Sequence, residues 1–361
     1  MSVYYAVFIL TVLLCILVPA KTDKEYKRKL VIVLLPLFLF GALRVDFGMD
    51  YSAYEDMFHS LHGSSLEEVD ESAHAELGYQ ALNIIMPTWR SLLVLTSFML
   101  CFSIGFLFYK SLDKNNLLLA ICVMFLAGNY AFYTPLVSMR NGLTNAVFLL
   151  SIPLIRDRRI VIVAIIAFLG SFLHSSLLLF MPLAYLVANN KPISMKEINI
   201  WLGCFGVFVV FGSSSIVDFF SGYLMTYFDR YELYFENVSK GRGYANILVG
   251  VTNLVIVGIM LYTIYHNRNR MSAVENSVSR IALLYPLSPY VGVFGGARWL
   301  TYFIPFFVVC IANMYSYTWK SKALKIGFYI LIFAYFSYSF FYIWQWNNPY
   351  FVFQTYHSIF D

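Results

Sequence analysis

Long apolar runs separated by short polar loops repeat from one end of the chain to the other. A helix needs about 20 residues to cross the hydrocarbon core of a bilayer, and most of these runs approach that length. The pattern therefore predicts an all-α polytopic membrane protein, a single integral membrane domain over residues 1–361 built as one bundle of about twelve transmembrane helices. The predicted helices lie near residues 3–20, 30–43, 91–109, 117–135, 141–155, 160–174, 175–188, 198–217, 244–265, 281–297, 299–319 and 326–346.

The runs at 160–174 and 175–188 leave the helix count open, because no polar loop separates them. Either residues 173–176 form a tight bend between two helices, or one long tilted helix covers both runs. A single helix would invert the membrane orientation of every later helix and loop. Inversion would move the basic segments 268–270 and 320–325 to the side that carries few other positive charges. We therefore prefer two helices.

Two connecting loops, at residues 44–90 and 218–244, are long enough to fold over one end of the bundle. The first contains an apolar patch at 77–89 that is too short to span a bilayer, which predicts a re-entrant or interface-lying helix. The second is rich in tyrosine and charged residues. We expect both loops to act as lids.

Composition excludes an ordinary soluble enzyme, since 60% of residues are hydrophobic and only 12% are charged. Eighteen of the 25 Lys and Arg residues fall in alternate loops, which the positive-inside rule places in the cytoplasm. Both chain termini and the two long loops are then predicted outside. The five cysteines all lie in apolar runs and predict core packing, not disulfides. No nucleotide-binding glycine motif, zinc-ligand spacing or nucleophile elbow occurs.

The most informative polar segment follows the second apolar run directly. It sets Arg44, Asp46, Asp50, Tyr51 and Tyr54 against the end of a predicted helix. Charge that faces lipid costs several kcal/mol, so such a cluster indicates a functional site at the membrane surface or in a wet cavity.

Five arginines from separate segments are predicted at this same outer face, namely Arg44, Arg140, Arg230, Arg242 and Arg298. Guanidinium groups bind phosphate oxygens bidentately and stay charged at any working pH. Any single one of them could instead snorkel or pair with an outer carboxylate. Together they predict a cluster that binds a phosphorylated ligand.

Candidates for proton transfer lie at the same face. His174 is the one histidine inside an apolar segment, and a neutral imidazole can accept a proton from a sugar hydroxyl. A histidine hydrogen-bonded across helices is an equally good interpretation. Asp46, Asp50 and Glu76 are candidate bases or acceptors for sugar hydroxyls. Outer tyrosines suit stacking on sugar rings, although an aromatic belt explains them equally well.

Several short motifs occur in a fixed order along the chain. They are Arg then Gly-x-Asp-Tyr-x-x-Tyr at Arg44, Gly48, Asp50, Tyr51 and Tyr54, Glu-x-Gly-Tyr at Glu76, Gly78 and Tyr79, an arginine opening a helix at Arg140, His-x-Ser at His174 and Ser176, and a late Arg with Tyr-Phe at Arg298, Tyr302 and Phe303. In these motifs the chain resembles the EpsG family of Wzy-type polysaccharide polymerases. Asn141 stands where the resemblance leads us to expect glutamine.

The resemblance implies a glycosyltransferase that joins oligosaccharide repeat units carried on undecaprenyl diphosphate, in O-antigen, capsule or exopolysaccharide assembly. It implies a multi-pass protein of the bacterial inner membrane whose active site faces the periplasm or outside. The donor and the acceptor would both be undecaprenyl-diphosphate-linked glycans, and a separate chain-length regulator would be a partner. We expect no metal, no other cofactor and no nucleic acid.

The same resemblance leads to residue roles. Arg44, Arg140, Arg242 and Arg298 are predicted to bind the diphosphate, with Arg140 also catalytic. His174 is the preferred base and Asp50 the second choice. The predicted sugar-binding residues are Asp46, Tyr51, Tyr54, Glu76, Tyr79, Arg230 and Tyr302.

Two other functions remain open at this point. A flippase or transporter of lipid-linked oligosaccharides is the main alternative, and it should show internal repeats or paired broken helices near the bilayer midplane. A membrane acyltransferase is a weaker one, because it should present a histidine toward the cytosol.

Overall fold

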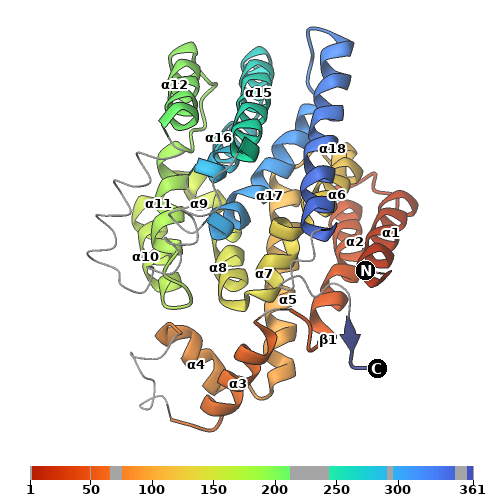
Figure 1. The fold of residues 1–361 in the computed structure, drawn as a ribbon, viewed down its shortest axis with the longest axis vertical. Coiled ribbons are helices and arrows are strands. Elements are labelled where there is room, and N and C mark those ends of the chain that lie inside the picture. The colour runs from red at the N-terminus through yellow and green to blue at the C-terminus, as the bar shows by residue number, and fades with distance from the viewer. Residues whose placement is uncertain are drawn as a thin grey trace.

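The computed structural model describes residues 2–48, 50–65, 75–211, 244–290, 296–345 and 356–360. This part of the chain is almost entirely helical, with sixteen α-helices and one pair of two-residue strands (Figure 1). The predicted all-α class is confirmed.

The described helices are named in chain order. Their bounds are α1 Ser2–Leu17, α2 Asp23–Ala42, α3 Tyr51–Leu61, α4 Leu77–Ile85, α5 Trp89–Ser111, α6 Leu117–Leu126, α7 Thr134–Val137, α8 Met139–Leu150, α9 Ile152–Arg156, α10 Ile160–Ser171, α11 Leu177–Val187, α12 Met195–Phe211, α15 Tyr244–Asn267, α16 Ala273–Ala282, α17 Gly296–Met314 and α18 Lys322–Gln345. The strands are β1 Arg44–Val45 and β2 His357–Ser358, which pair antiparallel.

Each of the twelve predicted ranges contains an observed helix, but the number of membrane spans is a separate matter. Within the described residues, α5 is the one helix long and apolar enough to cross a bilayer alone. A bent pair, residues 114–126 and 131–137, makes a second if it is counted as one span. The bundle of twelve spanning helices therefore stays a prediction.

Three predicted helices are interrupted or shifted in the structure. The run at 141–155 is divided at Ser151 into α8 and α9. The run at 117–135 bends sharply after α6 and continues as a single π-helical turn at Asn129–Tyr133 and the short α7. The run at 281–297 ends early, because α16 stops at Ala282 and a 3₁₀ helix follows at Tyr285–Tyr290. Pro286 and Pro289 lie in that 3₁₀ helix, and proline both lacks the backbone N–H that an α-helix needs and clashes with the preceding turn.

The apolar segment 160–188 forms two helices, as preferred from the charge distribution. α10 and α11 pack against each other as a hairpin (Figure 1), and the chain reverses between Phe172 and Ser176. The backbone N–H of His174 still donates to the carbonyl of Gly170, so His174 lies in the turn itself.

The described part of loop 44–90 folds as α3 and α4, which pack together at one end of the bundle (Figure 1). α4 is the short apolar helix expected from the sequence. Arg90, in the first turn of α5, donates to the carbonyls of Ala42 and Arg44 and so ties this end of α2 to α5. The second predicted lid, 218–244, lies outside the described residues except for Tyr244 at the start of α15.

The loops assigned to the cytoplasm gather at the opposite end. Asn116 donates to Ser316 at 2.8 Å, and Arg270 donates to Thr318 at 2.8 Å. Asn190 accepts from Ser277 at 2.8 Å. These contacts join loops that are far apart in sequence but share the predicted side, so the helices alternate in direction as the charge pattern requires.

The core around α17 is aromatic. Tyr302 lies 5.3 Å from Phe148 of α8 and 4.6 Å from Phe180 of α11, measured between ring centroids. Phe303 packs on both of the same rings. These contacts fix α8, α11 and α17 relative to one another, and each of the three begins beside the residues described next.

Candidate functional site

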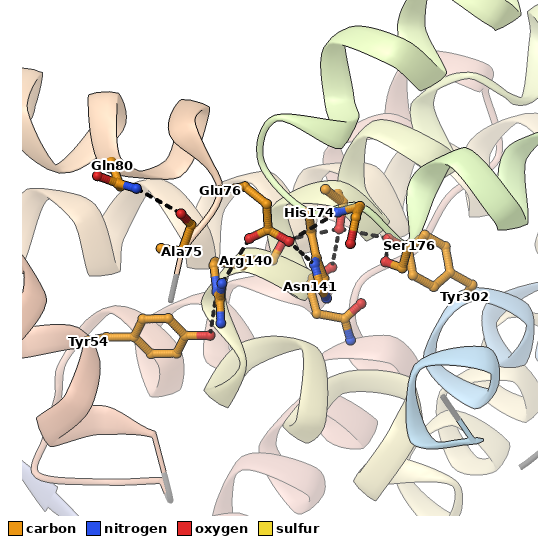
Figure 2. A network of polar contacts seen from close by, with 11 residues as sticks. Tyr54, Ala75, Glu76, Gln80, Arg140, Asn141, His174, Ser176 and Tyr302 are labelled. Carbon is orange, nitrogen blue, oxygen red and sulfur yellow. Dashed lines mark hydrogen bonds and ion pairs between the residues drawn. The ribbon is translucent and has the colours of Figure 1, made fainter. Parts of the chain in front are cut away.

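One carboxylate bridges two of the predicted site residues at the end of the bundle covered by α3 and α4 (Figure 2). Glu76 Oε2 lies 2.8 Å from Arg140 Nη1, and Glu76 Oε1 lies 2.6 Å from His174 Nδ1. The backbone N–H of Ser175 also donates to Oε1 at 3.1 Å. Three segments that are distant in sequence therefore meet at a single carboxyl group.

Glu76 is positioned by the packing of α4 on the turn between α10 and α11. The N–H of Tyr79 donates to the carbonyl of Phe172 at 3.2 Å. A Cβ added at Gly78 would lie 2.8 Å from that same carbonyl oxygen, so only glycine allows this approach. The Glu-x-Gly-Tyr motif thus places its carboxylate directly before a helix that must sit close to another backbone.

Arg140 lies in the first turn of α8, immediately after the break that ends α7. Its Nε donates to the Tyr54 hydroxyl at 3.5 Å, and its guanidinium lies 5.9 Å from the centre of the Tyr54 ring. Gly48 lets the segment before α3 approach α7, because it has φ +111° and a Cβ there would lie 2.8 Å from Val137. This second motif glycine brings Tyr54 to Arg140.

His174 lies in a buried polar cluster that continues toward α17. Two residues on, the Ser176 hydroxyl lies 3.1 Å from the Tyr302 hydroxyl, which donates to Thr144 Oγ1 at 2.7 Å. The His174 residue is only 5% exposed. The turn between α10 and α11 therefore contacts Glu76 through His174 and the α8–α17 interface through Ser176.

A second guanidinium and a second carboxyl group complete the cluster. Arg140 and Arg298 both act electrostatically on Asp50 and on His174. Unlike Arg140, the Arg298 side chain has neither an ion pair nor a hydrogen bond within the described residues. It is partly exposed, so it is available to an anionic ligand.

The protonation states follow from these contacts. Burial raises the pKa of Glu76, but the hydrogen bond from His174 and the charges of His174 and Arg140 outweigh it and lower that pKa to about 2. Glu76 is therefore ionised at neutral pH and can only accept hydrogen bonds. Consequently His174 Nδ1 carries the proton that it shares with Glu76.

The pKa of His174 lies below its ordinary value, mainly because burial disfavours the charged imidazole. Arg298 and Arg140 lower it further, while Glu76 opposes the shift. His174 is thus neutral at pH 7, with the lone pair on Nε2. An imidazole in this state, oriented by a carboxylate, is suited to accept a proton.

Asp50 is the second candidate base. Burial raises the pKa of its carboxyl group, and the positive charges of Arg140 and Arg298 oppose that rise. Asp50 precedes α3 without capping it through its side chain.

Of the five predicted arginines, Arg140 and Arg298 both act electrostatically on Asp50 and His174. Arg44 is 1% exposed and donates from Nη1 to the Leu136 carbonyl at 2.7 Å, and burial lowers its pKa to about 10. It lies within the protein and connects β1 to α7, so its contact with a diphosphate stays a prediction. Arg230 and Arg242 lie outside the described residues.

The predicted sugar-binding tyrosines all lie in the interior, with exposures of 0–5%. Tyr51 accepts from Trp89 Nε1 at 2.9 Å, and the rings of Tyr54 and Tyr79 lie 5.6 Å apart. With Tyr302 they form the framework around Glu76 and Arg140. Their stacking on a sugar stays a prediction, since it needs a ring face that is buried here. Asp46 is exposed, in a left-handed conformation with φ 45°.

Sequence reasoning did not identify three groups that the site uses. The Ser175 N–H binds Glu76, Thr144 accepts from Tyr302, and Arg90 secures the backbone at Arg44. Thr144 lies one helical turn after Arg140, a spacing that indicates the same face of α8. Across the described ranges, no group of three or more His, Cys, Asp and Glu side chains is arranged to hold a metal ion.

The comparisons with known proteins bear on this geometry. No curated protein and no solved structure matches the chain. The EpsG family, however, matches residues 27–358, a region that includes Glu76, Arg140, His174 and Arg298. With a match over nearly its whole length, the chain belongs to the EpsG family.

Proposed function

We propose that this protein is a Wzy-type polymerase that joins undecaprenyl-diphosphate-linked oligosaccharide repeat units at the outer face of the bacterial inner membrane. Membership of the EpsG family supports a membrane protein with a polymerase role in exopolysaccharide or O-antigen synthesis. The observation that carries the finer proposal is the Glu76 carboxylate held between His174 and Arg140.

In this proposal His174 is the general base. Its Nε2 accepts the proton from the acceptor sugar hydroxyl as that oxygen bonds to the anomeric carbon of the donor. Glu76 holds the imidazole in the correct tautomer and stabilises the imidazolium that forms, as a carboxylate does in hydrolase triads. Asp50 is the alternative base, since the raised pKa of its carboxyl group lies closer to neutral pH than that of an ordinary aspartate.

Arginines stabilise the leaving group. As the anomeric carbon–oxygen bond breaks, the lipid diphosphate keeps the electron pair and gains negative charge. Arg298, which has no carboxylate partner in the described part of the chain, and Arg140 supply fixed positive charge where it develops. Arg242 remains a proposed diphosphate ligand and Arg230 a proposed sugar ligand.

The remaining predictions fit the same scheme. The lipid tails would stay in the bilayer beside the bundle, and a separate chain-length regulator would determine when the polymer is released. The reaction as written needs no metal or nucleotide sugar, because the diphosphate-linked donor is already activated.

The proposal is tested with purified protein in liposomes that carry lipid-linked repeat units on the side of α3 and α4. We expect a ladder of polymer lengths on a gel. Arg140→Ala should abolish the ladder while the protein still expresses and inserts normally. A full ladder from that variant would remove Arg140 from the site.

A transporter of the same lipid-linked sugars is the second candidate, and the bent segment 114–137 is the observation that favours it. Paired broken helices are expected of a transporter, and the described residues contain one broken helix of this kind. The same liposomes separate the two functions. Movement of unextended units across the bilayer, with no ladder, would favour transport.

A further inference from the structure

A groove separate from the Glu76 cluster lies between α2 and α5, near the opposite end of these helices. It has a volume of about 500 Å³. Its walls are apolar and include Val31, Leu34, Leu35 and Phe38 of α2 with Phe98 and Phe102 of α5. Gly105 keeps it open, since a Cβ there would already lie 3.0 Å from Leu34. The proposed polymerisation reaction does not involve this groove.

Positive charge lies at one mouth of the groove. The Lys27 and Lys110 ammonium groups lie 4.7 and 5.2 Å from the centre of the Tyr109 ring. Asp23 accepts a hydrogen bond from the Tyr109 hydroxyl at 3.1 Å and pairs with Lys27 at 3.2 Å. Among the described residues Lys27 pairs with Asp23, whereas Lys110 lies against the Phe106 and Tyr109 rings without an ion pair, so one positive charge is left to attract an anion.

The length of the groove matches one leaflet of a bilayer. On α2 its lining runs from Lys27 to Phe38, which at 1.5 Å per residue is about 16 Å. The hydrocarbon core of a bilayer is about 30 Å thick, so a single leaflet is about 15 Å deep. The charged mouth lies at the end that the basic loops assign to the cytoplasm.

We propose that this groove binds one acyl chain of an anionic phospholipid from the cytoplasmic leaflet, with the lipid phosphate held by Lys27 and Lys110. The tail of the lipid carrier is a poorer fit, because it would enter from the end near Arg44, whereas on α5 the groove ends at Phe98, near the middle of that helix. The proposal requires a membrane protein with the predicted sidedness, and it is independent of the polymerase chemistry.

The first test fills the groove. Val31→Trp places a large ring in the mouth and should leave folding intact, since Val31 is 70% exposed. The full chain is extracted from vesicles of equal phosphatidylglycerol and phosphatidylcholine, and the lipid that stays bound is identified by native mass spectrometry. We expect one tightly held phosphatidylglycerol in the parent and its loss in the variant. Ile165→Trp, on the exposed face of α10, is the matched control and should keep the lipid.

The second test removes the charge. Lys27→Gln should weaken phosphatidylglycerol binding about fivefold, the equivalent of roughly 1 kcal/mol for one lysine near the head groups. Lys24→Gln removes the same charge from an exposed position of α2 that does not line the groove, and it should change binding less. Equal retention of both lipids, retention unchanged by Val31→Trp, or displacement of phosphatidylglycerol by undecaprenyl phosphate would each overturn the proposal.

Discussion

At the scale of single residues, Glu76 determines the state of both of its partners. It accepts the Nδ1 proton of His174 and neutralises part of the charge of Arg140 through different oxygens. His174 and Arg140 are therefore coupled, and under the proposed mechanism a change at Glu76 should alter proton transfer and anion binding together.

Glu76→Gln should lower the polymerisation rate at neutral pH about 10²-fold or more, since the imidazolium formed during proton transfer loses its counter-charge. The acid limb of the pH–rate profile should also move to lower pH, because Glu76 raises the pKa of His174 and its charge is now absent. Rates of ladder formation measured across pH test both effects. Asp56→Asn, at an exposed position of α3, should leave the profile unchanged. An unaltered profile in Glu76→Gln would exclude the coupled pair.

The Glu76 carboxyl group should also make the stability of the folded protein depend on pH. Its pKa in the folded protein is about 2, below the ordinary 4.5, so its contribution is fully present above pH 4.5 and is lost as the pH falls toward 2. The difference in Tm between the parent and Glu76→Gln, measured in detergent, should therefore shrink between pH 5 and pH 2. A difference that stays constant over this range would contradict the ionised state of Glu76.

Arg298 should matter for rate and not for folding. Arg298→Ala should reduce the polymerisation rate about 10²- to 10³-fold, the usual effect of losing a group that stabilises developing negative charge. Arg298→Lys should recover part of the rate, because it keeps the charge but not the bidentate geometry. The Tm of both variants should match the parent, since the side chain has no bonded partner among the described residues. A large fall in Tm would instead indicate a structural arginine.

Residue types were predictable from the sequence, but burial was not. The pattern identified Arg140, His174 and Glu76, which do meet. It did not show that Arg44 is buried against a carbonyl whereas Arg298 is partly exposed. That distinction depends on how α7 packs over β1, which no local spacing encodes.

At the scale of elements, the site depends on how closely α4 approaches the turn between α10 and α11. This single contact determines the position of the Glu76 carboxylate relative to the His174 imidazole. The glycines of the two family motifs are explained by such approaches and not by direct contact with a ligand.

Gly78→Val should therefore displace α4 and separate Glu76 from His174. We expect loss of the polymer ladder and a destabilisation of about 1–3 kcal/mol, typical of overpacking a close contact. Gly203→Val is the matched control, because nothing lies within 4 Å of a Cβ at that position. Activity and thermal unfolding of the two variants decide the matter, and full activity in Gly78→Val would show that the α4 contact is dispensable.

Helix existence was predictable at this scale, whereas helix ends were less so. Apolar runs indicated each helical region, but the turn signal of Gly128 and Asn129 after α6 was given too little weight beside the surrounding apolar residues, as were Pro286 and Pro289. The pairing of β1 with β2 could not be predicted, since each strand has only two residues.

Over the whole molecule, the two ends of the helical bundle carry different polar groups. The end with α3 and α4 holds the Glu76 cluster, and the opposite end joins the basic loops through hydrogen bonds such as Asn116 to Ser316. Sequence charge alone predicted this separation, because the positive-inside rule acts on whole loops and needs no knowledge of packing.

Cysteine labelling tests the predicted orientation. In a variant without native cysteines, Ser60→Cys on α3 should react in intact cells with a thiol reagent that does not cross the inner membrane. Ser321→Cys, just before α18, should react only after the membrane is opened. The reverse pattern would place the Glu76 cluster in the cytoplasm and end the proposal of an outer-face polymerase.

The contact of Tyr356 with Phe40 has a consequence for biosynthesis. The Tyr356 hydroxyl donates to the Phe40 carbonyl across 316 positions, and β2 then pairs with β1 beside Arg44. At roughly 5–20 residues per second, a ribosome needs tens of seconds to make the intervening chain. During that time the edge of β1 lacks its partner strand β2, so this corner of the end that carries the Glu76 cluster is completed only after nearly all of the intervening chain has been made.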